Sequence, residues 1–219
     1  AVQLRFGFEG VAEYNGSAYV AFQRVWPGDT NVRIGIYDVT AGTWSFLYYP
    51  LETPESQNGG WVGLSDLTSL GDGRFLVIER DNQGGPDATI KRVYSFSIDE
   101  VKFEPQPAEE NQVVDKTLIR DLIVAEDYAQ TGGLVLEKIE GLAVLAGGTI
   151  LVVNDNDGVD DSNGETQLFR FEYRSLLRCT IARWSRFTDP LLGQQTVSVA
   201  HLHDSSLEQS KKTMATLIA

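Results

Sequence analysis

The sequence is poor in cysteine, basic residues and long apolar runs, and each shortage excludes a class of protein. Its single cysteine, Cys179, cannot form an internal disulfide, which leaves the redox compartment open. The formal net charge of −13 argues against non-specific nucleic-acid binding, because such binding needs a basic face. No apolar run approaches the roughly 20 residues of a membrane-spanning helix. We therefore predict neither a nucleic-acid partner nor a membrane span.

The common catalytic motifs are missing as well. Segment 63–67 (GLSDL) lacks the second glycine of a nucleophile elbow. Both histidines, His201 and His203, lie near the end of the sequence, which disfavours a serine triad. There is no zinc-ligand spacing, and the helix-loop-helix calcium pattern fails around Gly158 and Gly164 because its end positions do not hold acids. Any enzyme chemistry must rest on carboxylates, amides, arginine and a metal.

A strand-forming pattern recurs along the chain. Segment 73–80 (GRFLVIER) lines up with 148–155 (GTILVVND), and 16–24 (GSAYVAFQR) is a looser copy. Each copy follows a glycine corner and precedes another alternating run that is typical of a strand. The period of about fifty residues, with an insertion before the third copy, is typical of propeller blades. We predict an all-β fold, a β-propeller of four-stranded blades.

The chain is short for a closed propeller, which usually has about four to eight blades. We expect a partial or truncated propeller, because about fifty residues per blade leaves room for three to four. The numbering starts at Ala1 without a methionine or a signal peptide, as expected for a start inside a longer or processed chain. We assign the blades to 1–173 and a divergent tail to 174–219, helical, disordered or an alternative C-terminus. Segment 113–125 is a helix or an outer strand, and its alternation favours the strand.

Oxygen-bearing side chains gather after the strand predicted at 149–153. They are Asn154, Asp155, Asn156, Asp157, Asp160 and Asp161. Such a loop either binds a hard cation or is a solvated turn, and both interpretations stay open. Glu9 and Glu140 precede equivalent glycines in two repeats, so a propeller would bring them together at its channel, where they could share a cation. The alternative is that each glutamate binds turn amides; the second repeat has Val62 at this place.

Segment 79–82 (ERDN) aligns with 154–157 (NDND). Glu79 is a candidate metal ligand or general base, and Arg80 a candidate clamp for a phosphate or carboxylate. The alternative is a Glu/Arg pair that ties neighbouring blades together.

These blocks resemble a known family. KIEGLAV and GTILVVNDNDGVDDSNGETQLFRF, together with DLTSLGDGRFLVIERDN and KTLIRDL, are similar to the phytase-like family, "esterase-like activity of phytase". The resemblance covers 8–173. It implies a β-propeller that hydrolyses phosphoesters or esters, usually exported (periplasmic or extracellular) in bacteria, and possible in a plastid if the source is a plant. By position it carries over Glu79, Arg80, Asp81, Glu140, Asn154, Asp155, Asn156 and Asp157.

The first hypothesis is a calcium-assisted hydrolase of small-molecule phosphate or carboxylate esters. The predicted metal ligands are Glu9, Glu140, Asn154, Asp155 and Asn156. The predicted catalytic residues are Glu79, Arg80, Asp81 and Asp157. The cation would polarise the ester oxygen and acidify a water, Arg80 would neutralise the developing anion, and Glu79 or Asp157 would accept the proton. The second hypothesis is a non-catalytic β-propeller, a binding or scaffold module with structural calcium, which the lack of a recognisable nucleophile favours. The oligomeric state is not predicted.

Overall fold

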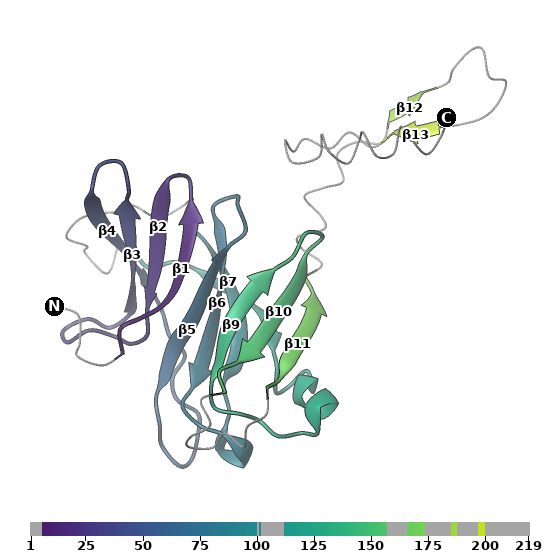
Figure 1. Cartoon of the computed structure of the whole chain (residues 1–219). Helices are drawn as coiled ribbons and strands as arrows, with labels where there is room; N and C mark the ends of the chain where they lie inside the picture. The colour runs from purple at the N-terminus through teal and green to yellow at the C-terminus, as the bar shows by residue number, and fades with distance from the viewer. Residues whose placement is uncertain are drawn as a thin grey trace. The chain divides into compact units, whose positions relative to one another are not determined.

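The computed structural model describes residues 6–99, 101, 112–156 and 166–173, and the backbone of 185–187 and 197–199. The chain divides into two compact units, one made of Ala1–Leu145 with Thr149–Phe171, the other of Ala146–Gly148 with Glu172–Ala219. The first unit contains three antiparallel sheets (Figure 1). The predicted all-β fold is therefore confirmed. In the part that the structure describes, no helix is long and apolar enough to cross a membrane.

Sheet A is a four-stranded antiparallel meander in the order β1-β2-β3-β4. Its strands are β1 (Phe8–Tyr14), β2 (Ser17–Phe22), β3 (Val32–Asp38) and β4 (Thr43–Tyr49). Inward-facing side chains alternate along β3, where Val32, Ile34 and Ile36 are buried, as the two-residue period of a half-buried strand requires.

Sheet B repeats this meander in the order β5-β6-β7-β8. Its strands are β5 (Val62–Ser69), β6 (Arg74–Asp81), β7 (Lys91–Ser97) and β8 (Lys116–Asp121). Strand β8 lies within 113–125, so the strand interpretation of that segment is confirmed over its middle. The short 3₁₀ helix η1 (Gly85–Asp87) precedes β7, and η3 (Asp127–Thr131) follows β8.

Sheet C has three strands, in the order β11-β10-β9. They are β9 (Ile139–Val144), β10 (Thr149–Asn154) and β11 (Leu168–Glu172). The second unit includes a further antiparallel pair, β12 (Ser185–Phe187) with β13 (Val197–Val199). The remainder of the predicted tail lies outside the described residues.

The first strands of the three sheets are neighbours. Strand β1 contacts β5, and β5 contacts β9, so the sheets lie side by side with their first strands adjacent (Figure 1). Between sheets A and B the core is aromatic: the Phe75 ring lies 4.6 Å from Tyr19 and 5.5 Å from Phe96. At Gly10 the two backbones approach so closely that a Cβ atom would lie 2.4 Å from the Leu67 nitrogen. A side chain at residue 10 would push β1 away from β5, and with it the neighbouring Glu9.

Candidate functional site

The end of strand β6 carries two adjacent charged residues that point to opposite sides of sheet B. Glu79 is 0% exposed and its carboxylate accepts hydrogen bonds from the Tyr49 hydroxyl at 2.9 Å and the Glu52 backbone N–H at 2.5 Å. The Lys116 ammonium donates a third, at 2.8 Å. Burial raises the pKa of Glu79, and Lys116 opposes that shift. Glu79 therefore ties the end of β4 to sheet B, and protein donors occupy its oxygens.

Arg80 points the other way and reaches sheet C. It is 3% exposed, and its Nη2 donates to the Glu140 carboxylate at 2.5 Å, while Nη1 lies 3.4 Å from Glu137. Its guanidinium carbon also lies 5.5 Å from the centre of the Trp61 ring. The nearly buried Arg80 guanidinium thus joins sheet B to strand β9 through its ion pair with Glu140.

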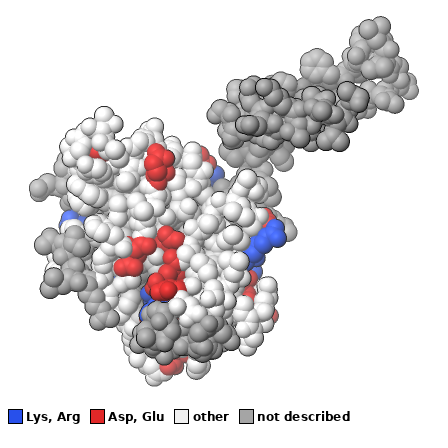
Figure 2. Space-filling view, viewed as in Figure 1, with Lys and Arg blue, Asp and Glu red and all other residues white. Residues whose placement is uncertain are grey.

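Glu9 comes from β1 and completes this group, which we name the Arg80 cluster: Arg80, Glu9, Glu137 and Glu140. Burial raises the pKa of Glu9, the charge of Glu140 raises it further, and the Arg80 guanidinium acts in the opposite direction. Among the described residues, the Glu9 carboxylate has no hydrogen-bond or ion-pair partner. Figure 2 shows acidic side chains gathered in the middle of the face over β1, β5 and β9. The structure therefore brings together three of the predicted site residues, Glu9, Arg80 and Glu140.

Asp81 and Asn82 have local structural partners. The Lys91 ammonium donates to Asp81 Oδ1 at 2.7 Å, and the backbone N–H groups of Thr89 and Ile90 donate to Oδ2. Although burial disfavours the charged carboxylate, Lys91 and these donors hold the pKa of Asp81 below its usual range. Asn82 Oδ1 accepts a hydrogen bond from the Trp61 backbone N–H at 2.6 Å. Asp81, predicted as catalytic, thus fixes the turn into β7 from a buried position.

Asn154 ends strand β10, and Asp155 and Asn156 follow it. Asn154 is buried, its Oδ1 accepts the Gln167 N–H, and its Nδ2 donates to the Asp155 carbonyl at 3.2 Å. The Asp155 side chain is exposed, and Asn156 Nδ2 lies 3.4 Å from the Thr166 hydroxyl. Asp157 lies outside the described residues, as do Asp160 and Asp161.

Two inner-strand residues that the sequence analysis did not assign connect sheets B and C. The Ser65 hydroxyl donates to the Ile139 carbonyl at 2.6 Å, and Asp66 Oδ2 accepts the Leu142 N–H at 2.6 Å. Burial raises the pKa of Asp66, which the N–H donors of Leu67 and Leu142 oppose. No sequence motif marks these residues. The signal that could have found them is their place in the first strand of the second repeat, which corresponds to the strands that carry Glu9 and Glu140.

The described residues do not by themselves form the predicted calcium site. Within the described ranges, no three His, Cys, Asp or Glu side chains lie close enough to hold a metal ion. Calcium takes about six to eight oxygen ligands. Glu9 and Glu140 supply two carboxylates, and Arg80 already occupies one of them. Calcium binding therefore stays a prediction.

The comparisons with known proteins give one match. The family model described as Phytase-like, esterase-like activity of phytase, matches residues 1–158. A search of curated proteins gave no match, and neither did a search of solved structures.

Proposed function

The chain belongs to the phytase-like family, and from this membership and the Arg80 cluster we propose that it hydrolyses small-molecule esters or phosphoesters. The family supports hydrolysis as the reaction type. The cluster supports Glu9 in particular, because a carboxylate with a raised pKa is suited to proton transfer near neutral pH.

The observation that carries the proposal is the state of Glu9. Its carboxylate is partly buried, its pKa is raised by burial and by the charge of Glu140, and it has no hydrogen-bond or ion-pair partner among the described residues. A structural glutamate in such a place would normally be bound, as Glu79 and Glu140 are. A carboxylate that is kept unbound and hard to ionise has the properties of a general base or acid.

We assign the proton transfer to Glu9 and its positioning to Glu140 and Arg80. A water oxygen would attack the phosphorus or carbonyl carbon while its proton passes to a Glu9 oxygen, and the alcohol would leave as the ester bond breaks. Glu9 would then return the proton to the leaving oxygen. Arg80 holds Glu140 in place, and Glu140 in turn raises the pKa of Glu9. Glu79, which the sequence offered as the base, is fully buried and bound in this structure, so it has no part in this scheme.

We also propose that the three sheets are blades of a β-propeller. Support comes from the repeated antiparallel meander and from the adjacent first strands β1, β5 and β9, as expected of strands around a central channel. Glu9, Asp66 and Glu140 would then lie on strands that line the channel.

A second candidate is the non-catalytic β-propeller module. The observation that favours it is that Glu79, Arg80 and Asp81 all bind neighbouring protein groups, so the ERDN segment has a complete structural role. In that case Glu9 and Glu140 would contribute to binding a ligand or a cation and would catalyse no reaction.

The proposal is tested by hydrolysis of a phosphomonoester and of a short-chain carboxylate ester, with and without added calcium. Wild type is compared with Glu9→Gln and Glu140→Gln, and with Glu13→Gln as the control, an exposed carboxylate on the same strand. We expect Glu9→Gln to lower kcat by about 10²- to 10⁴-fold, the usual contribution of a general base, and Glu13→Gln to change it little. Absence of turnover in the wild type with either ester would rule out hydrolysis and leave the binding module. Turnover that is equal in wild type and Glu9→Gln would rule out the role of Glu9.

A further inference from the structure

A cavity of about 350 Å³ opens where strands β2 and β4 end and β5 begins. Its wall includes Arg24, Glu52, Gly60 and Trp61. Cavities that hold small molecules start at about 300 Å³, so this one admits a small organic ligand. The described residues of its wall include none of the Arg80 cluster. The cavity adjoins that cluster, because the Trp61 ring in its wall also contacts the Arg80 guanidinium.

Arg24 differs from the other arginines whose contacts are known. Arg33, Arg74, Arg80, Arg92 and Arg120 each bind a carboxylate. Arg24 has no hydrogen-bond or ion-pair partner among the described residues, although the sequence holds 31 acidic residues. Its guanidinium instead contacts two aromatic rings, with its central carbon 4.8 Å from the centre of Phe6 and 5.0 Å from that of Trp61. Contacts with ring faces leave the N–H donors at the guanidinium edge available to a ligand.

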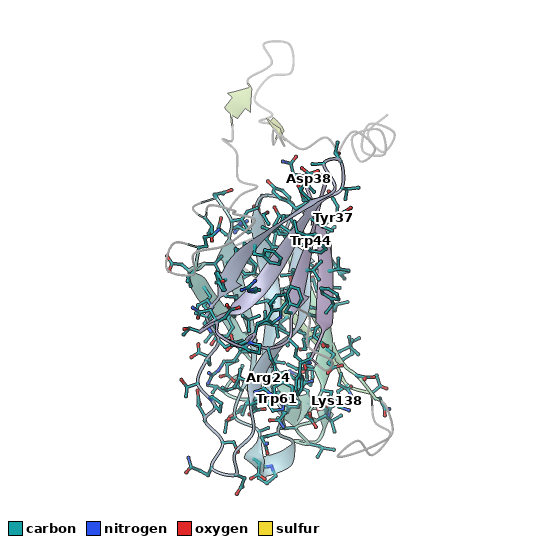
Figure 3. All side chains as sticks on the ribbon, turned by 90° about the vertical axis from the view of Figure 1, so that its left-hand side faces the viewer. Arg24, Tyr37, Asp38, Trp44, Trp61 and Lys138 are labelled. Carbon is teal, nitrogen blue, oxygen red and sulfur yellow. The ribbon has the colours of Figure 1, made fainter. Side chains whose placement is uncertain are left out.

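The aromatic groups that hold Arg24 are themselves fixed. The Trp61 backbone N–H donates to Asn82 Oδ1 at 2.6 Å, and the Trp61 carbonyl accepts the Asn82 backbone N–H at 3.0 Å. The preceding Gly60 has φ +104°, a conformation that disfavours other residues. Phe6 has φ 65°, which is strained for a bulky residue, and its ring packs edge-on against Trp61 at 5.3 Å. Figure 3 shows Arg24 and Trp61 next to each other.

The cavity wall has little unpaired negative charge that would repel an anion or bind Arg24 in its place. Glu52 is the carboxylate in the wall, and it accepts the Tyr94 hydroxyl at 2.9 Å and lies 3.0 Å from the Lys116 ammonium. Its charge is therefore offset by a neighbouring cation. An incoming oxyanion would meet Arg24 as the cation in this wall whose donors have no acceptor among the described residues.

We infer that Arg24 is the anion-binding residue of this cavity and takes the oxyanion group, phosphate or carboxylate, of a small ligand. A guanidinium edge binds two oxygens of such a group at once. The inference goes beyond the proposed hydrolysis, because binding needs no turnover and the cavity does not contain Glu9.

The test is titration of the protein with inorganic phosphate and, separately, with acetate, followed by calorimetry and by the NMR signal of the Arg24 Nε–H group. The variant is Arg24→Gln. The matched control is Arg33→Gln, which removes the same charge from an arginine that also stacks on aromatic rings but is bound to Asp29 at 2.6 Å. Folding of each variant is checked by its thermal unfolding midpoint.

We expect the wild type to bind at least one of the two anions, with the Arg24 signal shifting on titration. Arg24→Gln should bind it about tenfold more weakly or worse, the usual loss for a charge-assisted hydrogen bond, and Arg33→Gln should bind within about twofold of wild type. Binding of phosphate alone identifies a phosphate ligand, and binding of acetate alone identifies a carboxylate. The inference is overturned if neither anion binds, if the Arg24 signal does not move, or if Arg33→Gln weakens binding as much as Arg24→Gln. An Arg24→Gln protein that fails to fold leaves the NMR signal of the wild type to decide.

Discussion

Arg24 and Arg80 make an instructive pair, because they close equivalent segments of two sequence repeats and both lie over the same ring. Their guanidinium carbons are 5.0 and 5.5 Å from the centre of Trp61. Arg80 is nearly buried and bound to Glu140 and Glu137, whereas Arg24 is partly exposed and has no acceptor among the described residues. Equivalent positions of the two repeats thus hold an arginine in each case, but the two arginines have different surroundings. One guanidinium joins two sheets, and the other remains able to bind a ligand.

The difference arises from what each strand end faces. Beyond Arg80 lies strand β9, which begins with the Ile139-Glu140 corner and brings carboxylates to the guanidinium. Beyond Arg24 lies the connection from β4 to β5, which contributes an aromatic ring and a cavity instead. A buried charge must be paired, and a partly exposed one need not be. The surroundings therefore decide which arginine is structural.

The largest effect that this comparison predicts is on stability. Arg80→Met should lower the free energy of unfolding by about 3 kcal/mol, because it removes a nearly buried guanidinium from its ion pair with Glu140. Arg24→Met should cost less than about 1 kcal/mol, since it removes only the stacking contacts. Denaturant unfolding of both variants at neutral pH measures the difference. Equal losses would show that the two arginines have the same role.

The sequence predicted the strands better than the site. Alternation and glycine corners located the strands of all three sheets, because a half-buried strand must alternate. The sequence grouped the charged residues of segment 79–82 into one candidate site, yet their side chains diverge: Glu79 and Arg80 point to opposite sides, and Asp81 binds Lys91. Residue type and spacing do not say which partner from a distant strand will meet a charge. Arg24 was missed, although its alignment with Arg80 was the signal that could have found it.

A smaller effect follows from the support of Trp61. Asn82→Ala removes the acceptor of the Trp61 backbone N–H, so the backbone that carries the ring is fixed less firmly and the ring should hold Arg24 less well. We expect phosphate or acetate to bind about threefold to tenfold more weakly, since one hydrogen bond contributes about 1 kcal/mol. Asn58→Ala is the control, because Asn58 lies in the connection from β4 to β5 that leads to Trp61, but its side chain donates to Asp87. Calorimetric titration measures both, and an equal change in the two variants would contradict the support of Trp61 by Asn82.

The smallest effect concerns Glu9, and its sign depends on pH. Burial and the charge of Glu140 raise the pKa of Glu9 in the folded protein, so the folded state favours the protonated form. The stability from this preference is fully present below the unfolded value of about 4.3 and is lost as the pH rises through the folded value. Glu9→Gln keeps a neutral side chain at every pH. It should therefore match the wild type near pH 3 and be slightly more stable near pH 7, by less than about 1 kcal/mol because Glu9 is only partly buried. Denaturant unfolding at the two pH values measures the change. A variant that is less stable than wild type at pH 7 would mean that the Glu9 carboxylate has a stabilising partner. Glu9 would then be a bound charge like Glu140, and the contrast between the two would be wrong.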